Sequence, residues 1–350
     1  MQITSAEVTP VVINIRKPVR MAGVAEFSHV TAVFVRLVTR QGKSAWGCCV
    51  ASSDPADAVL RACQDCAAMV PDLHPTNIEF SLAELSDLTR SAPSALCAFD
   101  LAFHDLLGIT TGMPLYRLLG GYRNRIQTSA TISIASVQES VEAAVERAQM
   151  GFRILKVKGG LDPAEDVRRV QAVHRALPEL TLRLDADGGY TVQDALDVGR
   201  ALAGQIEMLE QPTPKEDLEG MRQVTRHSPV PVLADQSAAG PASVLELATR
   251  HSCDGVSVKV AACGGLSCAR QVDAIARAAR MTTMVSCLIE PALLISAGLS
   301  FALSSPNVAY GDLDGYLDLL NDPSLPGFRL EDGWLTASEE PGLGCKVKLG

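Results

Sequence analysis

The feature that most constrains the fold is a series of short apolar runs that each end in a charged residue. Asp185, Glu210, Asp235 and Lys259 follow such runs, and the intervals between them are 25, 25 and 24 residues. A β-strand with its crossover helix takes roughly 25 to 30 residues, so these intervals predict repeated strand–helix units and a parallel sheet. Lys158 ends an earlier run of the same kind. In a closed barrel all such strand ends lie on one rim, where their charges would converge.

The second half of the chain reads as a succession of strands separated by Ala-rich, helix-prone segments. One ring of charged strand ends favours a closed barrel over an open sheet. The predicted strands lie near residues 127–134, 153–158, 181–185, 206–210, 231–235, 255–259, 282–287 and 308–312.

The first part of the chain has a different pattern. Alternating apolar and polar residues over 2–15 and 30–50 predict antiparallel strands. Between these, residues 16–29 are rich in Pro, Gly, Met and charge, and we expect a mobile loop. Residues 54–119 look helical, and the region closes at Gly120 and Gly121.

Two local signals set the expected helix ends in this region. Asp54 precedes Pro55, which predicts an N-cap followed by proline at the first helical position. The stretch from Ala95 to Gly108 is apolar nearly all round, so we expect a buried helix that ends at Gly108.

Length and charge exclude several classes of protein. The chain has 350 residues, enough for a barrel of about 250 residues and a second domain. A net charge of −9 argues against nucleic-acid binding, and no apolar run reaches the roughly 18 residues of a membrane span. The ten cysteines lie mostly in apolar text and no secretory segment opens the chain, so we expect reduced thiols in a cytoplasmic protein. Cys63 and Cys66 lack a second pair at zinc-binding spacing.

Three consecutive strand ends carry Asp185, Glu210 and Asp235. Carboxylates packed together repel one another and raise each other's pKa, and a divalent cation removes that penalty. Three hard oxygen ligands with room for water and substrate suit Mg²⁺. The alternative is that three separate acids at loop starts are each solvated or ion-paired.

Lys158 and Lys259 lie on strands before and after the three acids, so a barrel would place them on opposite sides of the metal. A partly desolvated lysine near a dication should have a lowered pKa and can act as a base near neutral pH. Lys156 points to the same side of its strand as Lys158. It can lower the pKa of Lys158 by repulsion or contact a substrate carboxylate. The alternative is a set of ordinary strand-end lysines.

These motifs together resemble those of the enolase superfamily, in its muconate-lactonizing subgroup. The resemblance covers the chain from about residue 5 to its end and includes the segments 99–108 and 117–121, which are similar to the family's linker between capping domain and barrel. It depends on the order and spacing of Lys156-Val-Lys158, Asp185-Ala-Asp-Gly, Leu209-Glu210-Gln-Pro, Ala234-Asp235-Gln-Ser and Val258-Lys259.

The resemblance implies an α/β fold, a modified (β/α)₇β TIM barrel with an α+β capping domain formed by the N-terminal segment and the C-terminal tail. The expected domains are a capping domain over residues 1–121, a catalytic barrel over 122–320, and a segment over 321–350 that returns to the capping domain.

The resemblance also implies a chemistry. Asp185, Glu210 and Asp235 would bind one Mg²⁺ per subunit, and the metal would stabilise an enediolate formed when the proton alpha to a substrate carboxylate leaves. Lys158 and Lys259 would face the α-carbon from opposite sides, so that one removes a proton and the other returns one. This 1,1-proton transfer is racemisation or epimerisation. The same pair could also support a syn-elimination or a cycloisomerisation.

A second motif narrows the substrate class. Asp312 and Asp314 share one face of an extended segment and resemble the acids that hold the free α-ammonium group in dipeptide epimerases. The alternative is a turn-capping pair. Thr131 and Ser133 resemble the peptide-contacting segment of those enzymes. Glu290 matches an acid of the family's seventh strand, behind the site or on its oxyanion side.

We therefore expect a Mg²⁺-dependent epimerase of dipeptides, an isomerase that binds a small molecule and neither nucleic acid nor membrane. We also expect a homo-oligomer, as is common in the family. Alternatives on the same scaffold are an N-acylamino acid racemase, an o-succinylbenzoate synthase and a muconate cycloisomerase. A barrel that has lost its chemistry and only binds is a further alternative. One departure from the family pattern is Asp187, which stands where an asparagine is usual.

Overall fold

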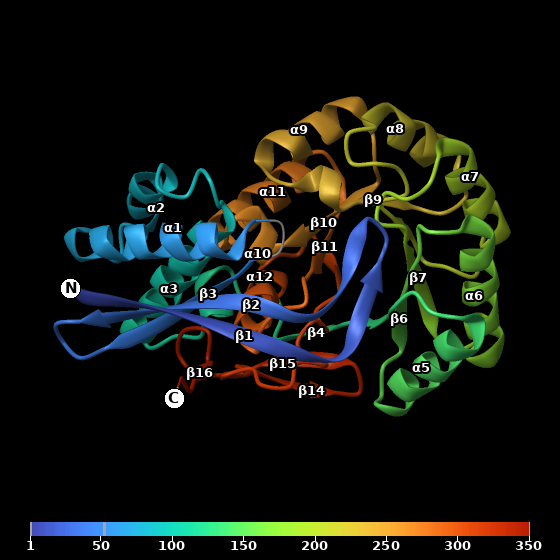
Figure 1. Cartoon of the computed structure of the whole chain (residues 1–350). Helices are drawn as coiled ribbons and strands as arrows, with labels where there is room; N and C mark the ends of the chain where they lie inside the picture. The colour runs from blue at the N-terminus through green and yellow to red at the C-terminus, as the bar shows by residue number, and fades with distance from the viewer. Residues whose placement is uncertain (1, 52–53, 350) are drawn as a thin grey trace.

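The computed structural model describes residues 2–51 and 54–349, in which a small capping region lies beside a barrel (Figure 1). The capping region holds an antiparallel sheet in the order β1 (Ile3–Met21), β2 (Val24–Thr39) and β3 (Ser44–Ala51). Helix α3 (Ser94–Thr111) packs against this sheet, with α1 (Ala56–Met69), the 3₁₀ turn η1 (Val70–Asp72) and α2 (Ile78–Ser86) beside it. The short α4 (Leu115–Leu118) leads to the barrel.

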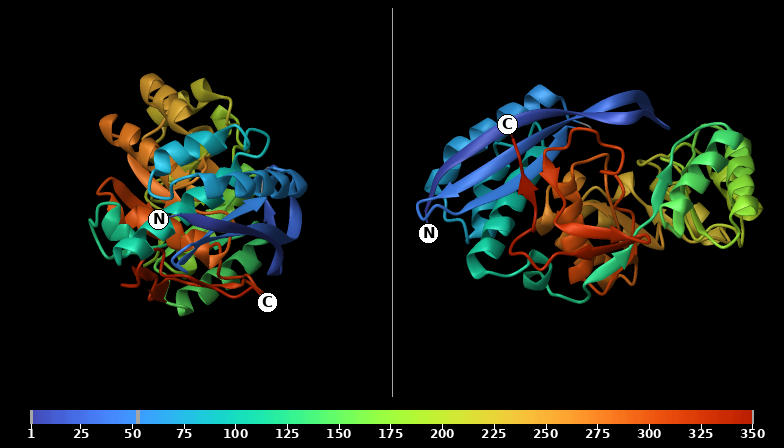
Figure 2. Two further views of the ribbon diagram at one scale, coloured as in Figure 1. Left: turned by 90° about the vertical axis from the view of Figure 1, so that its left-hand side faces the viewer. Right: turned by 90° about the horizontal axis from the view of Figure 1, so that it is seen from below.

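The expected mobile loop at residues 16–29 is not a loop. Strands β1 and β2 continue through it as one hairpin, which turns at Gly23 with a φ of 72°. Its tip reaches the barrel, where Ile134 N donates to Arg20 O at 3.4 Å (Figure 2). The prediction was wrong because most residues of this arm are exposed, so the sequence carries no buried alternation to mark the strands.

Two expected helix ends also differ from the structure. Helix α1 begins at Ala56 with Pro55 at its N-cap, and Asp54 instead accepts hydrogen bonds from the backbone N and the Oγ of Ser94 at the start of α3. Helix α3 continues past Gly108 to Thr111 and ends at Gly112, whose φ is 70°. Gly108 is therefore inside the helix, where it has a packing role.

The barrel is built from eight parallel strands that run in sequence order around the sheet. A parallel bridge between Thr128 and Gly311 joins the two edges of this sheet. The first expected strand is shorter than predicted, because residues 125–127 form a separate strand. The barrel strands are β5 (Ala130–Ile132), β6 (Ile154–Lys158), β7 (Thr181–Asp185), β8 (Leu209–Glu210), β9 (Val232–Ala234), β10 (Gly255–Lys259), β11 (Thr282–Ser286) and β12 (Val308–Gly311).

The helices that cover the barrel follow from local sequence. Ser136 with Glu139 and Thr191 with Asp194 form capping boxes that satisfy the first free N–H groups of two helices. One helix, α12, is apolar all round and almost entirely buried between barrel and cap. The helices are α5 (Val137–Gln149), α6 (Pro163–Ala176), α7 (Val192–Ala201), α8 (Leu218–His227), the 3₁₀ turn η2 (Gln236–Ala238), α9 (Pro241–Arg250), α10 (Val260–Cys263), α11 (Leu266–Ala278) and α12 (Ala292–Ser304).

The C-terminal tail returns to the capping region, as expected. Leu343 N donates to Asp105 of α3, and Gly342 packs against Gly108. The tail also pairs with the start of the barrel, which was not expected. Its strands are β13 (Ser324–Leu325) with β16 (Lys346–Val347), and β14 (Phe328–Glu331) with β15 (Trp334–Ala337), which pairs with β4 (Arg125–Gln127). The domain boundaries at residues 121 and 320 stay predictions.

The cysteines and the helices bear on two further expectations. All ten cysteines are free thiols, and six of them are buried. Within residues 2–51 and 54–349, no helix is both long and apolar enough to cross a membrane.

Replacing Gly108 by alanine should destabilise the fold. A Cβ built there would lie 2.4 Å from Gly342 Cα and 2.6 Å from Gly342 N, so the tail must shift. We expect Gly108→Ala to lower the free energy of unfolding in urea by about 1–3 kcal/mol. Gly199→Ala in α7 is the matched control, because the three atoms nearest to its Cβ would all belong to side chains, the nearest being Ser228 Oγ at 3.1 Å. Equal effects of the two substitutions would contradict this account of the tail.

Candidate active site

The two expected catalytic lysines lie across the barrel from each other. Lys158 is the last residue of β6 and Lys259 is the last residue of β10. These strands are four places apart in an eight-stranded barrel, which puts them on opposite sides of its axis. Asp185 ends β7 and Glu210 ends β8, and Asp235 directly follows β9. The predicted acids thus occupy the rim between the two lysines.

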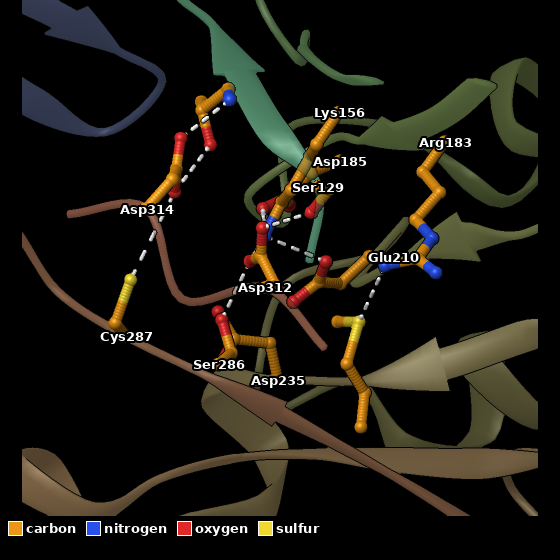
Figure 3. Close-up of polar contacts among 12 residues, drawn as sticks. Ser129, Lys156, Arg183, Asp185, Glu210, Asp235, Ser286, Cys287, Asp312 and Asp314 are labelled. Atoms are coloured by element: carbon orange, nitrogen blue, oxygen red, sulfur yellow. Dashed lines mark hydrogen bonds and ion pairs between the residues drawn. The ribbon is translucent and has the colours of Figure 1, made fainter. Parts of the chain in front are cut away.

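Lys156 lies at the centre of this charged cluster (Figure 3). Its buried Nζ is 2.8 Å from Asp312 Oδ2, 2.9 Å from Asp185 Oδ2 and 2.8 Å from Glu210 Oε2. Burial lowers the pKa of Lys156, but the surrounding carboxylates outweigh burial and raise it. This lysine therefore carries a positive charge that holds three acids from different strands together.

Lys158 and Lys259 each pair with an acid of a neighbouring strand end. Lys158 Nζ is 2.8 Å from Asp185 Oδ2 and 2.9 Å from Asp187 Oδ2, and Lys259 Nζ contacts both oxygens of Asp235. Burial lowers the pKa of both lysines, but their carboxylate partners raise it above the ordinary value. The sequence analysis expected a lowered pKa for Lys158, but with these carboxylates beside it the pKa of Lys158 is raised.

Three acids of this rim could hold a cation. Among the described residues, Asp185, Asp187 and Asp235 each offer a carboxylate oxygen, and these oxygens lie within 4.8 Å of one another. Asp187 was noted in the sequence only as a departure from the family pattern. Its φ of 45° places it in the left-handed region, which Asp tolerates better than most residues, in the loop that follows β7.

The burial and the missing hydrogen bonds of Glu210 show whether the site suits a cation. It is 1% exposed, and burial, followed by the charge of Asp185, raises its pKa to about 7. Although Lys156 is close, neither carboxylate oxygen makes a hydrogen bond of acceptable geometry within the described chain. A buried acid without hydrogen bonds beside clustered carboxylates fits a hard divalent cation such as Mg²⁺. The assignment of Glu210 as a ligand stays a prediction.

Asp312 and Asp314 lie on the other side of the rim. Asp312 accepts hydrogen bonds from Ser129 Oγ and Ser286 Oγ, two residues that the sequence did not indicate. Burial would raise the pKa of Asp312, but Lys156 and the two hydroxyls lower it to about 2. Asp314 behaves differently, since burial and the charge of Asp312 raise its pKa to about 6.

Thr131, which was expected to contact the substrate, instead contacts the carboxylate of Asp314. Its backbone N donates to Asp314 Oδ2 at 2.6 Å and its Oγ1 donates to Asp314 Oδ1 at 3.2 Å, so it orients this acid. Cys287 Sγ is 4.0 Å from the same carboxylate. Ser133 lies just beyond the end of β5 and is half-buried.

Glu290 lies in the loop between β11 and α12 and is 2% exposed. Leu288 N donates to its Oε2 at 3.2 Å. Burial raises the pKa of Glu290 to about 8, against smaller lowering effects of this hydrogen bond and of Lys259. At neutral pH this acid therefore holds a proton, close to the candidate base on β10.

Comparison with known proteins decides the family. Residues 3–120 match the model of the mandelate racemase/muconate lactonizing enzyme N-terminal domain, and residues 139–349 match the enolase C-terminal domain-like model. The chain belongs to the mandelate racemase/muconate lactonizing enzyme family. This family is part of the enolase superfamily, as the motifs had indicated.

Three proteins similar to this chain differ in the reactions that they catalyse. It is 34% identical over 326 residues to the L-Lys-D/L-Arg epimerase of Desulforapulum autotrophicum, covering 91% of this chain and 92% of the relative. It is 33% identical over 278 residues to muconate cycloisomerase 1 of Rhodococcus opacus, covering 77% and 74%. The crystal structure of a dipeptide epimerase from Enterococcus faecalis V583 with Mg and L-Leu-L-Tyr superposes with a TM-score of 0.95 at 30% identity, covering 99% of each chain. These relatives are all isomerases, and this family member is an isomerase.

The raised pKa of Glu290 predicts a pH-dependent cost in stability. Between its ordinary value of 4.5 and its folded value of about 8, the folded state keeps a proton that the unfolded state has released. Stability therefore falls as pH rises through this window. Glu290→Gln removes the titration, so its advantage over wild type should grow by at most about 1.4 kcal/mol per pH unit. Urea unfolding at several pH values, in the presence of EDTA, measures this difference. An advantage that does not change with pH would contradict the prediction.

Proposed function

We propose that this protein is a Mg²⁺-dependent epimerase of dipeptides, which inverts the carbon alpha to the substrate carboxylate by 1,1-proton transfer. The observation that carries the proposal is the placement of Lys158 and Lys259 on strands four places apart, with carboxylates on the strands between them. Two amines on opposite sides of one buried site can each reach a different face of the same carbon.

The two lysines would divide the proton transfer between them. Their raised pKa values keep both protonated in the present set of charges. A protonated lysine can serve directly as the acid, whereas its counterpart must lose a proton before it can serve as the base. Each lysine then acts as base for one epimer and as acid for the other, so both directions of the reaction use the same pair.

The cation would be held by Asp185 and Asp235, together with Glu210 or Asp187. These carboxylates now pair with lysines, and a bound Mg²⁺ would supply positive charge to stabilise the negative charge that develops on the substrate carboxylate. Lys156 would contact the substrate carboxylate from β6, while Glu290 would lie behind the site on the Lys259 side. A dipeptide epimerase of 30% identity has been crystallised with Mg and a dipeptide, which supports this choice of metal.

Asp312 and Asp314 would hold the free ammonium group of the substrate. Asp314 accepts from Thr131, and within residues 2–51 and 54–349 it forms no ion pair like the one between Lys156 and Asp312. Its raised pKa means that a cation placed nearby would gain a strong interaction, because it would favour the charged carboxylate. Ser133 lies beside this end of the site.

Deuterium exchange at the α-carbon tests the two-lysine scheme. In D₂O with Mg²⁺, the wild type should exchange the α-proton of both epimers of a dipeptide such as L-Leu-L-Tyr, and EDTA should stop the exchange. Lys158→Ala should abolish exchange from one epimer and Lys259→Ala from the other, each by roughly 100- to 10,000-fold. Lys215→Ala is the control, since this exposed lysine forms an ion pair with the equally exposed Glu216. Loss from the same epimer in both variants would sink the scheme.

A racemase of N-acylated amino acids or a cycloisomerase remains the second candidate, since muconate cycloisomerase 1 is a relative at 33% identity. The free ammonium group separates the two. We expect turnover of a dipeptide and none of its N-acetylated counterpart, measured by polarimetry or proton NMR. Asp314→Asn should lower kcat/KM for the dipeptide by roughly 10- to 100-fold, as expected for a lost hydrogen bond to a charged group. Turnover of the N-acetylated compound alone would favour the second candidate.

A further inference from the structure

A buried polar group outside the barrel wall fastens the chain directly after Lys158. It consists of Asp166 and Arg169 from α6 and Tyr190 from the loop after β7, and their exposed fractions are 2%, 0% and 2%. None of these residues stands at the end of a strand, so the sequence pattern that led to the site did not include them.

Hydrogen bonds from this group hold successive backbone units. Arg169 Nη2 donates to the carbonyl of Lys158 at 2.6 Å and also contacts Asp166 Oδ1. Asp166 Oδ2 accepts from Gly160 N at 2.7 Å and from the hydroxyl of Tyr190 at 2.6 Å. The backbone between them, at Gly159 N, donates to Asp185 O at 2.7 Å. The chain that carries Lys158 is thus fixed to α6 on one side and to β7 on the other.

The two glycines after Lys158 permit this close fit. A Cβ at Gly159 would lie 2.7 Å from Asp166 Oδ2 and 3.0 Å from the Tyr190 hydroxyl. A Cβ at Gly160 would lie 2.0 Å from the carbonyl oxygen of Ala186. Both positions require glycine because other groups approach the backbone closely. The loop therefore has little room to move relative to its partners.

Stability alone does not account for the burial of Asp166 and Arg169. Removing an arginine and an aspartate from water costs free energy that a buried pair often fails to recover. The Nε and Nη1 atoms of Arg169 are buried and make no hydrogen bond within the described residues, which adds to that cost. What the group does provide is a fixed position for the end of β6.

Lys259 is held by different contacts. It is the N-cap residue of α10, and the turn that follows is fastened by Asp100 of α3. Asp100 accepts from Leu266 N and from Ser267 Oγ at the start of α11. The two lysines therefore have separate supports, one from α6 and the loop after β7 and one from the cap.

We propose that Asp166, Arg169 and Tyr190 are positioning residues for Lys158, and that they control proton transfer on its side of the substrate only. The inference rests on the proposed two-lysine function. A reacting group displaced by about 1 Å can lose on the order of 100-fold in rate, so loosening this loop should affect the epimer that Lys158 deprotonates. The other epimer, which loses its proton to Lys259, should exchange at nearly the wild-type rate.

The test compares deuterium exchange from the two epimers of one dipeptide. Arg169→Lys keeps the charge beside Asp166 but loses the planar fork that reaches the Lys158 carbonyl, and Tyr190→Phe removes a single hydroxyl with little risk to folding. We expect Arg169→Lys to slow exchange by roughly 10- to 100-fold for the epimer that Lys158→Ala also loses. Tyr190→Phe should show the same bias to a smaller extent.

Asp273→Asn is the matched control. Asp273 is also a buried carboxylate with side-chain partners, Ser305 and Asn307, but these lie before β12 at the other end of the barrel. Its loss should affect both epimers equally. If wild type exchanges both epimers and Arg169→Lys and Tyr190→Phe slow both equally, the positioning role is overturned while the proposed function stands. If wild type exchanges neither, the proposed function fails and the positioning role fails with it.

Discussion

The structure depends on ion pairs at the barrel rim, where buried lysines offset the mutual repulsion of several carboxylates. Asp185, Glu210 and Asp312 come from three different strands, yet Lys156 holds all of them within 2.9 Å of its amine. Removing such charges from water is tolerable only where opposite charges and hydrogen bonds replace the water. The strand order of the barrel brings the partners together, because β6 to β10 each carry a charge at or directly after their ends and Asp312 directly follows β12.

Much of this rim could be predicted from the sequence, because a parallel barrel turns linear spacing into spatial order. The positions of Lys158, Asp185 and Lys259 at strand ends follow from the period of about 25 residues, and the structure confirms each of them. A closed barrel was expected from the single ring of charged strand ends, and a bridge between Thr128 and Gly311 joins the edges of the sheet. A charged residue after an apolar run marks a strand end clearly, because the apolar residues before it are buried in the barrel core.

The rest could not be predicted because it depends on contacts without a period. The arm formed by residues 16–29 pairs with itself in solvent, so no buried face marks it as two strands. Ser129 and Ser286 support Asp312 from two strands, and a serine in a strand is unremarkable until its neighbour is known. Asp166 and Arg169 lie three residues apart on α6, a spacing that is common for ion pairs on exposed helix faces, yet both are buried. In each case burial or a tertiary contact that has no repeat in the sequence decides the role of the residue, and only the fold reveals it.

The balance of charge in the site also limits what can bind there. Seven carboxyl groups, those of Asp185, Asp187, Glu210, Asp235, Glu290, Asp312 and Asp314, surround three amines, those of Lys156, Lys158 and Lys259. Burial raises the pKa values of Glu210, Glu290 and Asp314 to about 7, 8 and 6, and neighbouring carboxylates contribute to the rise for Glu210 and Asp314. A buried site in which carboxylates outnumber amines favours the binding of a cation, because the cation stabilises the charged form of the carboxylates. A divalent cation on the β7–β9 side and an ammonium group beside Asp312 and Asp314 would supply that charge at two separate points. The proposed dipeptide substrate carries its carboxylate and its free ammonium group on different residues, so it would present them to these two points.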